Sequence, residues 1–82
     1  IEKKHKVTQA ECEEAFSNYP FHITNDLEHS QSESRYRGLG RTSSHRLLTV
    51  VFTIRGRNTR VISARDMNKK ERKEYEEIKA HS

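Results

Sequence analysis

The large apolar side chains of this 82-residue chain are concentrated in one short segment. Leu, Ile, Val and Phe together supply only 16 residues, just under the one-fifth level at which a chain begins to look disordered. Half of those 16 lie between positions 47 and 64. A disordered chain has no reason to cluster them, so we expect one small folded domain, residues 1–82, with its core in this segment.

The segment has the alternating pattern of two neighbouring β-strands. Residues 46–54 form the first strand, the chain turns at 55–58, and residues 59–64 return as the second strand. One face of the first strand is fully apolar, with Leu48, Val50, Phe52 and Ile54. Its other face is half apolar, with Leu47, Thr49, Val51 and Thr53.

Helix signals flank this sheet on both sides in the sequence. Thr8 forms a capping box with Glu11 and begins the first helix, which Pro20 ends. Asn68 and Glu71 repeat the capping box at the start of a last helix that runs almost to the end of the chain. The apolar stripe of this last helix is narrow, so we expect it to depend on a partner or a substrate for firm packing.

Two shorter segments complete the predicted fold. Residues 21–27 and 35–41 alternate in polarity and predict two further strands, the second with Gly38 and Gly40 on one face. Because these glycines leave little side chain, another backbone or a helix can approach closely there. The order predicts an α+β domain with an N-terminal helix, a three- to four-stranded antiparallel sheet and a C-terminal helix.

Several classes of protein and site are excluded by composition. No apolar run approaches the roughly 18 residues of a membrane span. Cys12 is the only cysteine, so it cannot form an internal disulfide, and no Cys/His cluster has zinc-ligand spacing. We therefore expect a protein of a reducing compartment, the cytoplasm, without a metal or other cofactor. A chain this short has a small core, so a homodimer is also plausible.

Charge divides the chain into two unlike parts. Residues 1–34 have a charge balance of −4, and residues 35–82 have a balance of +8. Positions 35–65 hold eight arginines with no acid and no lysine. A planar guanidinium grips phosphate oxygens in a fork, so this pattern predicts a nucleic-acid surface. A solvated sheet face is the alternative, although ordinary surfaces mix both signs.

Candidate reactive groups gather around the start of the last helix. Arg65 comes just before that helix, whose N-terminal N–H groups favour an anion. Arg72 and Tyr75 share a helix face, and Glu71 lies one turn before Tyr75. Together these groups could bind a phosphodiester and move protons on it, whereas a capped, ion-paired helix is the alternative. His5, which titrates near neutral pH, is a further candidate beside a surface role.

Several motifs of this chain occur together in one known family. They are Lys-His-Lys-Val-Thr at 4–8, Arg-Tyr-Arg-Gly-Leu-Gly-Arg-Thr at 35–42, Arg-Leu-Leu-Thr-Val-Val-Phe-Thr at 46–53, and Val-Ile-Ser-Ala-Arg-Asp-Met at 61–67 followed by Glu71, Arg72 and Tyr75. In this series the chain resembles the BrnT family of ribonuclease toxins from bacterial type II toxin–antitoxin modules. The resemblance implies a RelE-like fold, RNA cleavage with growth inhibition, and neutralisation by a small ribbon-helix-helix antitoxin, through which operator DNA is bound.

The resemblance also implies a set of functional residues. The expected catalytic residues are His5, Arg65, Glu71, Arg72 and Tyr75. Cleavage of this kind needs no metal, because a base takes the ribose 2′-OH proton, Arg65 and Arg72 stabilise phosphoryl charge, and an acid protonates the leaving oxygen. The base is left open between His5 and Glu71. The resemblance adds Lys4 as an RNA contact, and the arginine-rich segment predicts further contacts from Arg41, Arg46, Arg55, Arg57 and Arg60.

Two departures from the family pattern accompany these expectations. Family members carry a short aromatic-acidic segment ahead of the position of Ile1, and the sequence implies that this segment is missing. The usual glycine after Lys-His is Lys6 here. Two other functions therefore stay open: a nucleic-acid-binding module without catalysis, and an interaction protein whose basic face only receives an acidic antitoxin segment.

Overall fold

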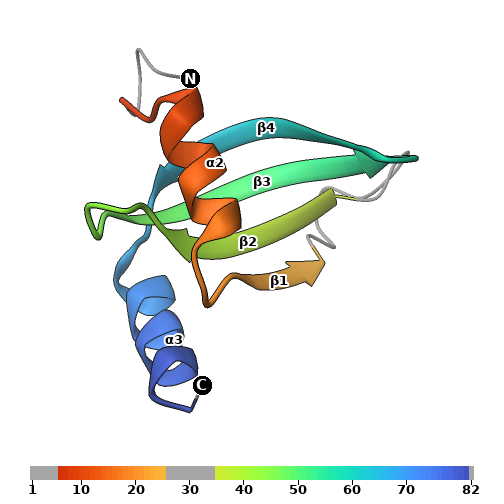
Figure 1. The fold of residues 1–82 in the computed structure, drawn as a ribbon. Helices are drawn as coiled ribbons and strands as arrows, with labels where there is room; N and C mark the ends of the chain where they lie inside the picture. Colours follow the sequence, from red (N-terminus) through yellow and green to blue (C-terminus); the bar gives the residue numbers. More distant parts are fainter. Residues whose placement is uncertain (1–5, 26–34, 82) are drawn as a thin grey trace.

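A computed structural model describes residues 6–25 and 35–81 of the chain. Its elements, in order, are α2 (Gln9–Ser17), β1 (His22–Asn25), β2 (Arg35–Arg41), β3 (Leu47–Arg55), β4 (Asn58–Asp66) and α3 (Lys69–Ala80). The four strands form one antiparallel sheet in the order β1-β2-β3-β4, with a helix before it and a helix after it (Figure 1). This confirms the predicted α+β class. Within the described residues, no helix is long and apolar enough to cross a membrane.

Helix α2 begins at the predicted capping box. The backbone N–H of Glu11 donates to Oγ1 of Thr8 at 3.1 Å, and the N–H of Thr8 donates to the Glu11 carboxylate at 3.0 Å. These bonds satisfy two of the N–H groups that a helix start leaves without partners. The helix ends at Ser17, shortly before Pro20.

Helix α2 packs across one face of the sheet (Figure 1). The buried cluster beneath it consists of Val7, Cys12, Ala15, Leu48, Val50, Phe52 and Ala64. Close approach depends on the glycines of β2: a Cβ at Gly40 would lie 2.9 Å from the carbonyl oxygen of Ala15 and 2.7 Å from Cδ1 of Phe21. The predicted close approach of a helix is confirmed at Gly40, whereas at Gly38 the ring of Phe21 fills the space.

Helix α3 packs on the opposite face, at one end of the strands. Tyr75 of α3 is fully buried there with Leu39 and Met67, and Leu47 packs against them. Figure 1 shows α3 at the end of the sheet away from the β3–β4 hairpin. The hairpin end of this face is therefore not covered by either of the described helices.

Two isoleucines of the sheet are exposed, including Ile54, which was predicted to lie on the apolar face. Ile54 and Ile23 each have 50% of their surface accessible. Ile54 lies near the hairpin end of β3, which extends past α2 (Figure 1). Ile23 lies on β1, a strand at the edge of the sheet. The alternating pattern predicted correctly which face of β3 carries Ile54. It could not predict how far α2 extends over that face.

Candidate functional site

Arg65 and Glu71 join the last strand to the last helix. Arg65 is in β4, opposite Thr49 of β3, and Glu71 is in the first turn of α3. Nη1 of Arg65 lies 2.8 Å from Oε1 of Glu71, and Nη2 lies 3.0 Å from Oε2. Two parallel hydrogen bonds of this kind fix both the position and the plane of the guanidinium.

The Glu71 carboxylate accepts hydrogen bonds from three strands and from its own helix cap. Besides Arg65, its donors are Oγ1 of Thr49 at 2.9 Å, the backbone N–H of Asn68 at 3.0 Å and Nη1 of Arg37 at 3.5 Å. The side chain is only 4% exposed. Burial alone would raise its pKa, but these hydrogen bonds, led by those from Arg65, hold the pKa of Glu71 at about 2.

Arg65 and Arg37 both bind Glu71 and are both partly exposed to solvent. The side chains of Arg65 and Arg37 are 40% and 36% exposed. Hydrogen bonding to Glu71 raises the pKa of Arg65 still further, so the guanidinium stays charged. Fixed cations with an accessible edge can stabilise negative charge that develops on a phosphate.

Arg37 and Thr49 were not among the residues expected at the site. The sequence placed Arg37 on the same strand face as Arg35 and Leu39, but it did not connect that face with the last helix. The strand register explains why both residues lie near Arg65 and Glu71. Thr49 pairs with Arg65, and Arg37 pairs with Val51, which is two residues from Thr49 on the same face of β3. Both residues could have been predicted by aligning the strands at 35–41, 46–54 and 59–64 so that side chains on the same face pair across the sheet.

Arg72 is not part of the cluster around Glu71. It is exposed on α3 and makes no hydrogen bond or ion pair with another described side chain. Successive helical residues point about 100° apart, so Arg72 projects in a different direction from Glu71. The structure therefore brings Arg65 and Glu71 together and leaves Arg72 beside them on the surface.

Tyr75 is buried and bonded to the backbone. Its hydroxyl donates to the carbonyl oxygen of Pro20 at 2.7 Å, and its surface is fully buried. Burial also raises the pKa of the phenol. In this arrangement Tyr75 attaches α3 to the segment between α2 and β1, and its hydroxyl is not available to a substrate.

We predict that Tyr75→Phe weakens folding without slowing catalysis. The change removes one buried hydrogen bond and leaves the Pro20 carbonyl without that donor, which should cost about 1 kcal/mol, or about 4–8 °C in Tm. Thermal unfolding and RNA cleavage by the same preparation are the measurements. A large fall in the cleavage rate of the fully folded variant would mean that Tyr75 takes part in the reaction.

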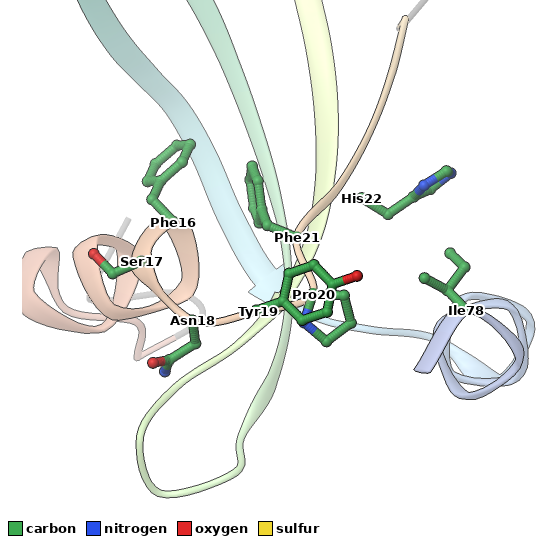
Figure 2. Close-up of a pocket in the computed structure, with 8 residues that line it drawn as sticks. All are labelled: Phe16, Ser17, Asn18, Tyr19, Pro20, Phe21, His22 and Ile78. Atoms are coloured by element: carbon green, nitrogen blue, oxygen red, sulfur yellow. The ribbon is translucent and has the colours of Figure 1, made fainter. Parts of the chain in front are cut away.

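A groove of about 330 Å³ lies next to this attachment point. It is lined by Phe16, Ser17, Asn18, Tyr19, Pro20, Phe21, His22 and Ile78, and Figure 2 shows Ile78 of α3 across from the α2–β1 segment. The Tyr19 side of the groove is open, since Tyr19 is 71% exposed. The lining contains no arginine and no carboxylate, so it lacks the groups that phosphate chemistry requires.

Two of the expected RNA-binding arginines hold the protein together. Arg46 contacts Asp66 at 2.8 Å, Glu11 at 3.2 Å and the carbonyl oxygen of Lys6 at 2.8 Å. Arg41 donates to the carbonyl oxygen of Tyr19 at 3.0 Å. These contacts tie separate segments to one another.

The other expected contacts lie in two places. Arg55, Arg57 and Arg60 are exposed around the β3–β4 hairpin. Lys4 and His5 lie outside the described residues. Among the residues that the structure does describe, no group of three or more His, Cys, Asp or Glu side chains could hold a metal ion.

Comparison with known proteins identifies the family of this chain. Residues 2–71 match the model of a family described as the ribonuclease toxin BrnT of type II toxin–antitoxin systems. Neither the curated proteins nor the solved structures gave a significant match. The family match covers most of the chain and includes both Arg65 and Glu71. The chain therefore belongs to the BrnT family, the ribonuclease toxins of type II toxin–antitoxin systems.

Proposed function

We propose that this ribonuclease toxin cleaves RNA, without a metal ion, at the exposed edge of the Arg65–Glu71 pair. RNA as the substrate and an antitoxin as the partner follow from the family. The location of the site rests mainly on one observation: a buried carboxylate binds Arg65 through two hydrogen bonds and leaves 40% of that side chain exposed. A cation held in this way is preorganised to stabilise phosphoryl charge.

Each residue then has a distinct role in the proposal. Arg65 and Arg37 bind the non-bridging oxygens and stabilise the charge that gathers on them during cleavage. Arg72, the exposed cation that follows Glu71, supplies a further contact to the RNA. Glu71 is a positioning residue, because a carboxylate with a pKa of about 2 takes up no proton at neutral pH. Of the two candidate bases, this favours His5 for the 2′-OH proton.

Cleavage of a labelled RNA in the presence of EDTA tests this function. Products ending in a 2′,3′-cyclic phosphate are expected, since the ribose 2′-OH is the nucleophile. The Arg65→Ala protein, purified in parallel, controls for contaminating ribonucleases, and Lys79→Ala controls for loss of one positive charge elsewhere on α3. Salt-dependent retention of intact RNA, with or without added Mg²⁺, would instead support a binding module without catalysis.

The partner and the assembly are proposed from the family alone. We infer that the antitoxin is a ribbon-helix-helix protein through which the complex binds operator DNA. We also infer that the toxin acts on cellular RNA in the cytoplasm. Neutralisation by occlusion requires the antitoxin to cover Arg65 and Arg37, for which an acidic segment is suited. A complex in which both side chains stay open to solvent contradicts this arrangement. Sedimentation of the toxin alone tests for a homodimer.

A further inference from the structure

One buried hydroxyl group contacts the carboxylate that orients Arg65. Thr49 lies in β3, opposite Arg65 of β4 on one side and Leu39 of β2 on the other. It is 1% exposed, and its Oγ1 donates to Oε1 of Glu71 at 2.9 Å. The proposed function uses Glu71 to hold Arg65, so a group that holds Glu71 acts on the same site.

A threonine in a β-strand does not by itself indicate a function, since threonine is common in strands. Thr53 provides the comparison, because it lies on the same face of β3, two alternations further along. It is also 1% exposed, but its hydroxyl has no hydrogen-bond partner within the described residues. Thr49 therefore differs from an ordinary strand threonine in what its hydroxyl contacts.

The two carboxylate oxygens of Glu71 are held unequally. Oε1 accepts hydrogen bonds from Thr49, from the backbone N–H of Asn68 at 3.0 Å and from Nη1 of Arg65 at 2.8 Å. Oε2 accepts from Nη2 of Arg65 at 3.0 Å and from Nη1 of Arg37 at 3.5 Å. Among these donors, Thr49 and Asn68 are the ones that do not belong to an arginine. A carboxylate bound by the arginines alone would turn with them.

The last side-chain torsion of a glutamate does not fix the plane of its carboxylate. This torsion has a broad distribution, so the carboxylate turns easily unless its oxygens are held. Asn68 holds Oε1 from the start of α3, and Thr49 holds it from β3. Rotation of the carboxylate out of its plane would break the bond from Thr49. The hydroxyl therefore resists a rotation that would also turn the guanidinium of Arg65.

We propose that Thr49 is a positioning residue for RNA cleavage, because its hydroxyl fixes the plane of the Glu71 carboxylate and thereby the direction of Arg65. The inference rests on the proposed site and adds a residue that acts on the reaction only through Glu71. Donors to a transition state must be placed to within about 0.5 Å. Loss of this bond should therefore slow the chemical step more than it weakens RNA binding.

Thr49→Val tests the proposal, since it removes the hydroxyl and keeps the branched shape. The single-turnover rate at saturating RNA should fall roughly tenfold. The RNA concentration for half-saturation should change little, because every charge that binds RNA remains. Thr49→Ser restores the hydroxyl but loses a buried methyl group, so it should recover the rate while its Tm stays below that of the unmodified chain.

Thr53→Val is the matched control for removal of a buried hydroxyl from β3. The Thr53 hydroxyl has no partner within the described residues, so this variant should cleave RNA at the unmodified rate.

The titration of Glu71 reports the same contact without a cleavage assay. Burial raises the pKa of Glu71, and its hydrogen-bond donors, led by Arg65 and including Thr49, lower it to about 2. The pKa should therefore be higher in Thr49→Val than in the unmodified chain, and unchanged in Thr53→Val. NMR of the side-chain carboxyl carbon measures it.

Equal rates for folded Thr49→Val and the unmodified chain would overturn the proposal. A Thr49→Ser protein as slow as Thr49→Val would also overturn it, since shape and not the hydroxyl would then matter. Arg65→Ala, measured in the same assay, separates this inference from the proposed function. An inactive Arg65→Ala protein beside a fully active Thr49→Val protein contradicts only the role of Thr49. Normal cleavage by Arg65→Ala contradicts the proposed site, and with it the role of Thr49.

Discussion

Arg65→Ala is expected to lower the rate of RNA cleavage by at least about a hundredfold and to abolish growth inhibition on expression. Arg65 is the cation that Glu71 orients most directly, through hydrogen bonds of 2.8 and 3.0 Å. Loss of one preorganised donor to transition-state charge typically costs about 3–4 kcal/mol in activation free energy. Single-turnover cleavage of a labelled RNA measures the effect on the chemical step.

The same substitution should leave a folded protein that still binds its antitoxin, but one of lower stability. Without Arg65, the buried Glu71 carboxylate loses two donors and keeps Thr49, Asn68 and Arg37. Arg65→Lys keeps the charge and loses the two-pronged geometry, so it should recover stability more than activity. Full toxicity of a folded Arg65→Ala variant would remove Arg65 from the mechanism.

Local signals predicted the elements of this fold well. Both capping boxes form as expected, at Thr8 and at Asn68, because a cap depends on residues only three positions apart. Strand alternation also predicted the face that carries Gly38 and Gly40. These features depend on neighbouring residues, so one sequence contains the information that they need.

Partners of the charged side chains could not be predicted in the same way. The segment 35–65 contains eight arginines and no acid, so their partners could not be predicted from it. In the structure Arg46 binds Glu11 and Asp66, and Arg37 binds Glu71. Which carboxylate an arginine meets depends on strand register and on where each helix packs, which are long-range properties. Tyr75 shows the same limit, since helical spacing placed it near Glu71 but not against the Pro20 carbonyl.

Glu71 both caps α3, as predicted, and binds Arg65. One carboxylate oxygen accepts the backbone N–H of Asn68 and also a hydrogen bond from Arg65. The helix start and the orientation of the arginine therefore depend on a single ionised group. Protonation or removal of that group should disturb both together.

Acid should destabilise this protein through Glu71. The carboxyl has an ordinary pKa of 4.5, which falls to about 2 in the folded protein. Because the folded pKa is the lower one, the ionised group stabilises the fold above pH 4.5, and that contribution disappears as the pH falls from 4.5 to 2. The difference corresponds to about 3 kcal/mol of unfolding free energy, since the side chain is almost fully buried.

Glu71→Gln isolates this contribution. At pH 7 the variant should unfold more easily than the unmodified chain by about 3 kcal/mol, because a neutral amide binds the two arginines poorly. Near pH 2.5 the two proteins should approach equal stability, as the carboxyl of the unmodified chain becomes partly protonated. Urea unfolding at both pH values measures the change. Glu76→Gln, on the exposed side of α3 with a side chain 58% accessible, is the control and should show a small difference that varies little with pH. A Glu71→Gln deficit of the same size at both pH values would mean that shape, and not charge, makes Glu71 necessary.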